Sequence, residues 1–323
     1  MLTYRTFRNT DPPVITAIWR SRIGQPGLAH LVSPELFEQL VFAKLYFDYE
    51  GLILAYDDDR PVGFAHAGFG PKEARNESPG EISPELGVVC LVMVRPDCAE
   101  TEVAAGLLGQ CEQYLHRRGA KVIYGGGIYP LNPFYLGLYG GSELPGVLLS
   151  DIVMRQVYAS SGYREIDQTL LMRQNLGGFQ AVIDRQQMQI RRRMIVEVVA
   201  DAPARFWWEA CTMGEFELTR YKLVPRSGGP PLATATLRSM EPSGTIGAGR
   251  AIGLIELEVE PSAHRRGLAS FLLSEACRQF VRQGIMVVEA QVMRYNEAAI
   301  GLYHKLGFEQ VDQGSVYRKD ADA

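Results

Sequence analysis

The chain repeats one pattern of side chains at an interval of about half its length. In the second half a polar residue precedes a tyrosine, a glycine and an aromatic residue: Asn296, Tyr303, Gly307 and Phe308. The first half has the same spacings in Asp151, Tyr158, Gly162 and Tyr163. Two strand ends also match, Val92-Met93-Val94-Arg95-Pro96 and Leu257-Glu258-Val259-Glu260-Pro261. One long period of this kind predicts the duplication of a domain and argues against a solenoid of short repeats.

Size and composition are consistent with two ordinary globular domains. The 323 residues exceed what one compact core usually organises, and 46% are hydrophobic while 22% are charged. The net charge of −4 gives no support for broad binding to nucleic acid or to an anionic membrane surface, which needs a basic face. There is no charged-then-apolar leader and no apolar run of the roughly 18 residues that a membrane span needs. We therefore expect a cytoplasmic protein with neither a nucleic-acid nor a membrane partner.

The cysteines and histidines predict neither disulfides nor a metal site. The five cysteines are scattered without a CxxC pair, which is typical of free thiols in a reducing compartment. His30, His66 and His116 lack the spacing of metal ligands, so we expect no metal. Trp207 and Trp208 favour packing in the core or between domains.

Strand and helix patterns mix along both halves and predict an α+β fold, in which strands pair in parallel only where a helix connects them. A polar stretch at 173–178 separates the halves, so we predict domains of residues 1–176 and 177–323.

The last predicted element is a helix over 297–306. Loops are predicted over 70–86, 125–150, 225–231 and 241–250, and the second is long enough to indicate a functional loop or lid. Its glycines match neither GxGxxG nor GxxxxGK[ST], which excludes nucleotide loops of those types.

A strand, a short turn and a helix in the second half predict an anion site. The strand Ile255 to Val259 runs into Pro261, and two arginines and a glycine follow before an apolar-faced helix begins at Leu268. The glycine allows a close approach of the backbone, the helix N-terminus offers free N–H groups, and arginines suit phosphate oxygens. The first half has Ala99 to Ala104 at this place, with Glu100 and Glu102 instead of the arginines. Carboxylates there would repel a phosphate, so we expect the first half to have lost the anion site.

These segments together resemble a known family. The turn His264-Arg265-Arg266-Gly267-Leu268-Ala269 is similar to the (Gln/Arg)-x-x-Gly-x-(Gly/Ala) pyrophosphate loop of the GNAT acyl-CoA-dependent N-acyltransferases. About 30 residues further on, the segment from Asn296 to Phe308 resembles that family's N-x-x-A-x-x-(L)-Y-x-K-x-G-F segment. The whole chain looks like a tandem GNAT protein, an arrangement also found in mycothiol synthase-like acetyltransferases. The resemblance implies two GNAT-like domains, the first degenerate, each a mixed, centrally parallel-splayed sheet flanked by helices. His264 departs from the Gln or Arg of the motif, and a loop that acts through backbone N–H groups should tolerate the change.

The resemblance also implies a reaction, the transfer of an acetyl group from acetyl-CoA to a primary amine by direct attack in a ternary complex. CoA would be held by the turn and by Asn296, and the backbone of Leu257 and Val259 would hold the thioester and the pantetheine arm. Tyr303 would protonate the departing thiolate. Tyr303 also shares a helical face with apolar residues, so a plain core role is the alternative, and Asn296 is also suited to capping the helix.

The base and the acceptor are less defined by the residues. Glu256 and Glu258 lie on one face of the strand and could take the amine proton through water, or they could simply face solvent. The acceptor, a small molecule or a peptide, is expected between the halves near the loops 70–86, 125–150 and 225–231. Two other functions fit the same motifs: a non-catalytic CoA-binding sensor or scaffold, and a transferase that uses a longer acyl or an aminoacyl donor. Nothing in the sequence indicates the oligomeric state.

Overall fold

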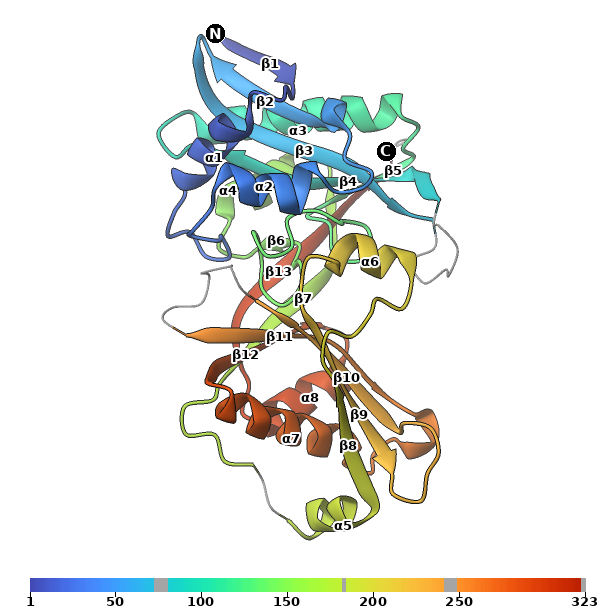
Figure 1. Ribbon diagram of the computed structural model, residues 1–323. Helices are drawn as coiled ribbons and strands as arrows, with labels where there is room; N and C mark the ends of the chain where they lie inside the picture. The colour runs from blue at the N-terminus through green and yellow to red at the C-terminus, as the bar shows by residue number, and fades with distance from the viewer. Residues whose placement is uncertain (73–80, 182–183, 241–248, 321–323) are drawn as a thin grey trace.

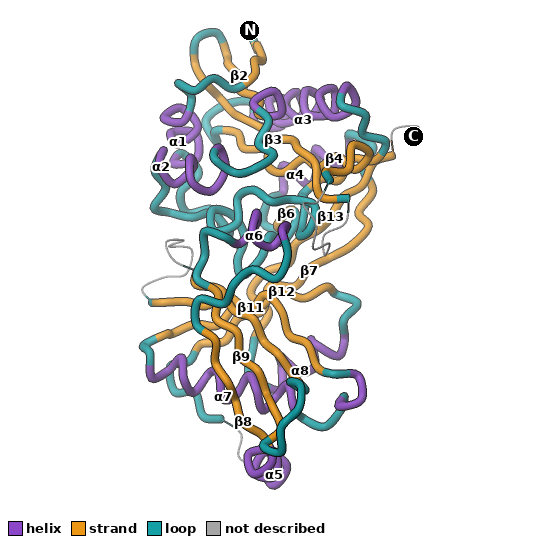
Figure 2. Tube along the Cα trace, turned by 45° about the vertical axis from the view of Figure 1, so that its right-hand side comes forward, coloured by secondary structure: helices purple, strands orange, loops and turns teal. Residues whose placement is uncertain are grey.

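The computed structural model describes residues 1–72, 81–181, 184–240 and 249–320. The described chain forms two lobes that share one continuous sheet, and most of the helices lie on the outer faces of the lobes (Figures 1 and 2). The N-terminal half builds the upper lobe of Figure 1, and most of the C-terminal half builds the lower one. The sheet mixes parallel and antiparallel pairs, which confirms the predicted α+β fold class.

The N-terminal half mixes strands and helices, as its sequence patterns predicted. Its elements are β1 (Leu2–Thr6), α1 (Pro12–Arg20), α2 (Pro34–Phe37) with a π-helical turn (Glu38–Phe42), a 3₁₀ turn (Tyr49–Gly51), β2 (Leu52–Asp57), β3 (Arg60–Pro71), β4 (Ile82–Val94), α3 (Glu100–Arg117), β5 (Val122–Gly125), β6 (Val147–Leu148), α4 (Ile152–Ser160) and β7 (Arg164–Asn175). Helix α3 forms because apolar residues recur on one side, which buries Val103, Leu107 and Cys111. The predicted loop 70–86 is shorter than expected, because strands occupy its two ends. Residues 73–80 of this loop lie outside the described part of the chain.

The C-terminal half repeats this order. Its elements are α5 (Arg185–Arg193), β8 (Met194–Val199), α6 (Trp207–Met213), β9 (Leu218–Pro225), β10 (Ala233–Ser239), β11 (Arg250–Val259), a 3₁₀ turn (Pro261–Ala263), α7 (Leu268–Arg282), β12 (Ile285–Met293), α8 (Glu297–Lys305) and β13 (Glu309–Asp320). Most of the predicted loop 241–250 lies outside the described residues. Strand β13 follows the last predicted helix and was not predicted, because the polar run Glu309 to Gly314 gives little apolar alternation.

The two halves exchange their last strands. The sheet order is β1-β2-β3-β4-β5-β13-β7-β12-β11-β10-β9-β8. Strand β13, from the end of the chain, pairs with β5 of the N-terminal half, while β7 pairs with β12 of the C-terminal half. In Figure 1 the two strands run side by side between the lobes, and the C-terminus lies next to β5. The sheet therefore crosses the predicted boundary at residues 176 and 177 with strands from both sides.

The repeat predicted from the sequence is visible in the strands. Each half has one parallel pair whose strands are connected by a helix, β4 with β5 and β11 with β12. Each half also has a bulge in the first strand of that pair, because Cys90 and Ile255 are the extra residues in the pairing with β3 and β10. Both bulges lie two residues before the matched positions Val92 and Leu257. The duplication thus extends to an irregularity of the backbone.

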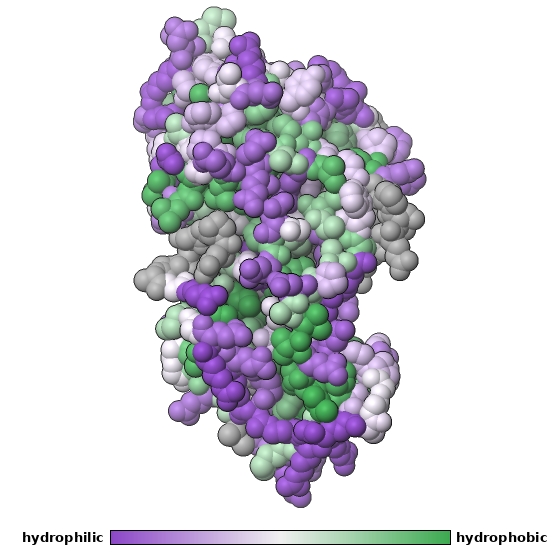
Figure 3. All heavy atoms as spheres, in the orientation of Figure 1, coloured by the Kyte–Doolittle hydropathy of each residue, from purple (hydrophilic) through white to green (hydrophobic). Residues whose placement is uncertain are grey.

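The core continues from one half into the other. Phe37 and Leu40 belong to the same buried cluster as Met213 and Phe216 of the C-terminal half. Across the same interface, the indole N–H of Trp208 donates to the Pro130 carbonyl at 2.8 Å, in agreement with the packing in the core or between domains predicted for this residue. Figure 3 shows hydrophilic residues over much of the visible face, with hydrophobic residues gathered on the lower lobe. None of the described helices is both long and apolar enough to cross a membrane.

Candidate active site

The candidate site lies where β11 and β12 part. Their parallel pairing ends at Leu254 and Ala290, next to the bulge at Ile255. Beyond the bulge, β11 stays paired with β10 as far as Val259, so its other edge turns toward the gap between the diverging strands. Leu257 and Val259 lie on this stretch, half-buried against the core beneath α7. A strand edge of this kind presents backbone N–H and C=O groups to a ligand.

The turn before α7 has the backbone of an anion site. Arg265 and Gly267 both have left-handed φ angles, of 57° and 76°. Backbone curled in this way aims successive N–H groups to one side, as in anion-binding nests. Arg265 and Arg266 are exposed. The Leu268 side chain is buried in the core, which leaves its backbone N–H for a ligand at the helix start.

Two side chains hold this turn in place. His264 Nε2 lies 2.8 Å from the Val259 carbonyl oxygen and donates to it in the tautomer that carries the proton on Nε2. The Gln186 amide donates to the Arg266 carbonyl at 3.1 Å. The His264 side chain thus binds the end of β11 and not the turn itself, so the N–H groups of the turn stay directed outward. Ala269, at the next helical position, is half-buried and adds no bulk at the helix start.

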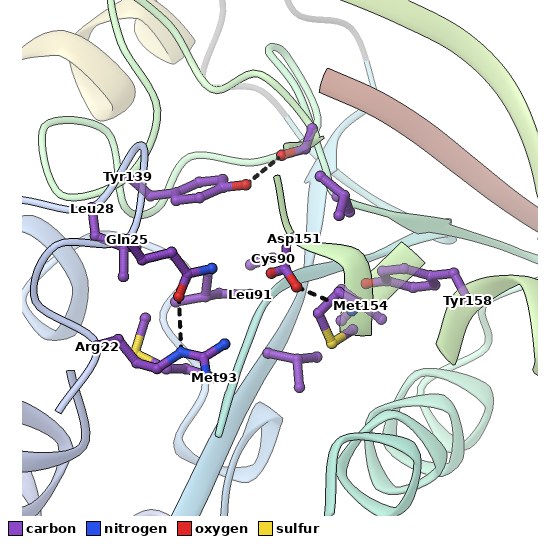
Figure 4. A pocket seen from close by; sticks show the side chains of 15 residues that line it. Arg22, Gln25, Leu28, Cys90, Leu91, Met93, Tyr139, Asp151, Met154 and Tyr158 are labelled. Atoms are coloured by element: carbon purple, nitrogen blue, oxygen red, sulfur yellow. Dashed lines mark hydrogen bonds between the residues drawn. The ribbon is translucent and has the colours of Figure 1, made fainter. Parts of the chain in front are cut away.

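In the corresponding turn of the first half, a glutamate is paired with an arginine of the same half. Glu100, at the start of α3, forms a 2.6 Å ion pair with Arg22. Beside it lies a cavity of about 40 Å³, where β4 and β5 diverge. Figure 4 shows β4 residues and Arg22 around it together with Tyr158, the tyrosine that corresponds to Tyr303. Such a volume holds about three water molecules, too few for a pantetheine arm. These observations support the expected loss of the first anion site.

Tyr303 lies on α8, and Asn296 directly precedes this helix. Asn296 caps the helix, since its side-chain oxygen accepts the Ala299 N–H at 3.1 Å. Asp151 caps α4 in the same way through Met154. Tyr303 is buried beside Phe308, with 5.3 Å between the ring centroids. Burial, together with the nearby Glu143 carboxylate, raises the pKa of Tyr303, so the phenol keeps the proton that an acid must donate.

The two predicted bases differ in their surroundings. Glu256 is half-buried and forms a 2.6 Å ion pair with Arg205, which also binds Glu209 at 2.8 Å. Glu258 is exposed two residues further along β11. Both carboxylates thus lie on β11 near the gap, and Glu256 already has a cationic partner.

A segment that no motif marked also reaches the site. Residues 141–146, part of the predicted functional loop 125–150, cross from the N-terminal half onto β11 and β12. Glu143 lies in this segment, and its carboxyl acts electrostatically on Tyr303. The length of the loop was the only signal in the sequence, and it did not single out a residue. Among the described residues, no group of His, Cys, Asp and Glu could hold a metal ion.

The chain matches the model of the acetyltransferase (GNAT) family over residues 20–139 and again over 191–308. The two matches cover more than half of the chain, so the protein belongs to the GNAT family, as a tandem member and an acyltransferase. No curated protein matches the sequence.

Solved structures show the same fold over nearly the whole chain. A tandem GNAT protein from the clavulanic acid biosynthesis pathway is 11% identical, with a TM-score of 0.68 and 99% of each chain covered. A GCN5-related N-acetyltransferase from Sphaerobacter thermophilus is 14% identical, with a TM-score of 0.61 and 99% of this chain and 95% of the other covered. A glucosamine N-acetyltransferase region of a fungal multi-domain β-N-acetylglucosaminidase is 15% identical, with a TM-score of 0.68, and the match covers 99% of this chain and 38% of that protein. At these identities the likeness concerns the fold alone.

Proposed function

We propose that the protein transfers an acetyl group from acetyl-CoA to a primary amine of a small molecule or a peptide, in a ternary complex at the C-terminal site. The observation that carries this proposal is the contrast between the two turns. The second half presents Arg265 and Arg266 on left-handed backbone at a helix start, whereas the first half closes the same place with the ion pair of Glu100 and Arg22. The CoA pyrophosphate would lie on the N–H groups of the intact turn, with Asn296 beside it.

The remaining groups fit the chemistry of acyl transfer. The thioester would lie in the gap between β11 and β12, against the backbone of Leu257 and Val259. The amine attacks the thioester carbonyl, and the tetrahedral intermediate expels the CoA thiolate. Tyr303, which keeps its proton, gives that proton to the thiolate. A carboxylate must first accept a proton from the substrate ammonium, and Glu256 and Glu258 are the candidates that the motif region supplies.

The test combines binding and turnover. We expect calorimetry to show one equivalent of acetyl-CoA bound, and a panel of primary amines to contain one that releases free CoA thiol. Replacement of Tyr303 by Phe should leave CoA affinity unchanged and lower kcat about 100-fold, because general acids contribute on this scale. The matched control is Tyr158→Phe in the first half, which should keep full activity.

Other outcomes separate the alternatives. Binding of CoA without turnover of any amine would favour a sensor or scaffold. Turnover with a longer acyl-CoA and none with acetyl-CoA would favour the other donor class. A greater loss in Tyr158→Phe than in Tyr303→Phe would move the active site to the first half, and a failure to bind CoA or acetyl-CoA would overturn the proposal.

A further inference from the structure

Strand β12 fixes the chain on both sides of Glu143. The carboxylate of Glu289 accepts the Ser142 N–H at 3.0 Å, and the Gln291 amide donates to the Leu144 carbonyl at 2.8 Å. Glu289 lies within the parallel pairing, while Gln291 follows its last residue, Ala290. The backbone around Glu143 is therefore held at the point where β11 and β12 begin to diverge.

Two further features make this attachment rigid. Arg238 is fully buried and donates to the Ser142 carbonyl at 2.8 Å and to the Gly141 carbonyl at 2.6 Å. Glycines also allow the segment to lie directly on the strands. A Cβ on Gly141 would come within 1.7 Å of a Glu289 oxygen, and one on Gly253 would come within 2.9 Å of Ser142 Cα. Glu143 thus has a defined place, as a catalytic group needs.

The surroundings of Glu143 are those of a carboxyl that exchanges a proton near neutral pH. Ser142 and Leu144 are buried, whereas Glu143 is half-buried. Loss of solvation raises the pKa of Glu143 to about 8, with Arg238 of β10 opposing the shift and Glu256 of β11 adding to it. Two groups on other neighbouring elements belong to the same set of charges. Glu289 of β12 raises the pKa of Arg238, and the Glu143 carboxyl raises the pKa of Tyr303 of α8.

We propose that Glu143, supplied by the N-terminal half, is the general base of the C-terminal site. This inference rests on the proposed function. A substrate ammonium gives one proton to the Glu143 carboxylate and becomes a free amine, whose lone pair forms the new C–N bond with the thioester carbonyl carbon. When the C–S bond breaks, Tyr303 protonates the thiolate, and the second proton lost by the nitrogen restores the phenol. Glu143 then releases its proton to solvent, so that one amide, one thiol and one proton are formed.

Glu143 has two advantages over the glutamates of β11. Glu256 is already paired with Arg205, so accepting a proton there would weaken an ion pair with 2.6 Å between the charged atoms. The Glu143 carboxylate also acts electrostatically on Tyr303, as expected of a base and an acid that serve one reacting centre. The first half therefore contributes a reacting group to the second.

The experiment compares Glu143→Gln with wild type on an amine that the wild type acetylates. The substitution preserves the shape of the side chain and removes the base, so kcat/KM should fall at least 100-fold while the affinity for acetyl-CoA stays within twofold. In the wild type, kcat/KM should rise through an inflection near pH 8, and this inflection should be absent from Glu143→Gln. Glu143→Asp, which keeps a carboxylate, should recover part of the activity. The matched control is Glu309→Gln, at an exposed glutamate on β13, which should behave as wild type.

The two proposals fail in different ways. If the wild type acetylates an amine and Glu143→Gln does so equally well with the same pH profile, only this inference is overturned. A larger loss in Glu256→Gln or Glu258→Gln than in Glu143→Gln would assign the base to β11 and overturn it as well. If the wild type acetylates no amine, the proposed function fails, and the inference fails with it.

Discussion

His66 of β3 is buried among aromatic rings, with the Phe134 centroid 4.5 Å from its own. Within the described part of the chain, neither ring nitrogen has a hydrogen-bond partner. Burial lowers the pKa of His66 from 6.5 to about 3, against a smaller opposing effect of Asp48. The imidazole is therefore a neutral member of the core.

This burial predicts a pH dependence of stability. Because the unfolded chain takes up a proton at His66 below pH 6.5 and the folded chain does not, the contribution of the neutral ring is complete above pH 6.5. It should be lost as the pH falls toward 3, by at most about 1.4 kcal/mol per pH unit. Urea unfolding at several pH values should therefore show a shallower decline for His66→Leu than for wild type. The exposed His30→Leu is the control, and an identical slope in His66→Leu and wild type would contradict the argument.

At the scale of elements, local patterns were sufficient for most helices and strands. Strand β8 covers the apolar-rich run from Met194 to Val199, and α8 begins after Asn296, which caps it as the sequence indicated. The sequence from 179 to 189 is compatible with a helix that links the halves, but α5 begins only at Arg185, where Asp184 caps it. Boundaries shift in this way because a single capping side chain decides where a helix starts.

The turn before α7 gives a prediction at this scale. Reversing one charge at the exposed Arg266 should weaken CoA binding about 10- to 100-fold, because charged hydrogen bonds contribute about 1.5–3 kcal/mol. The backbone of the turn should be unaffected, since it is held by His264 and Gln186. Calorimetry with CoA on Arg266→Glu measures the effect. Glu102→Ala, at the corresponding helix start of the first half, is the control and should bind CoA as wild type does; equal affinities for all three proteins would refute the role of the turn.

At the scale of the molecule, the exchanged strands make each half depend on the other. Without β13, both β5 and β7 lose a neighbour, and without the C-terminal half β7 also loses β12. The buried cluster that includes Phe37 and Phe216 spans the halves as well. The division at residues 176 and 177 remains our proposal for the two duplicated units, which we expect to fold together.

Cooperative unfolding is the measurable consequence. Trp19 lies in the core of the N-terminal half, whereas Trp207 and Trp208 lie on α6 of the C-terminal half. Urea unfolding followed by tryptophan fluorescence should coincide with unfolding followed by circular dichroism, in one transition. A chain that ends at residue 308, and so lacks β13, should lose this transition. Two separate transitions in the full chain would show that the halves fold independently.

The sequence by itself determined the duplication, the family motifs, the intact turn at Arg265 to Gly267 and the cap of α8 at Asn296. These features depend on residues close together in the chain, where spacing and side-chain chemistry fix the local backbone. Only the tertiary structure decided three other features: the exchange of β7 and β13, the ion pair between Arg22 and Glu100, and the position of Glu143. Each joins residues that no local pattern relates, and their proximity follows from how the sheet is ordered and which loops pack on it.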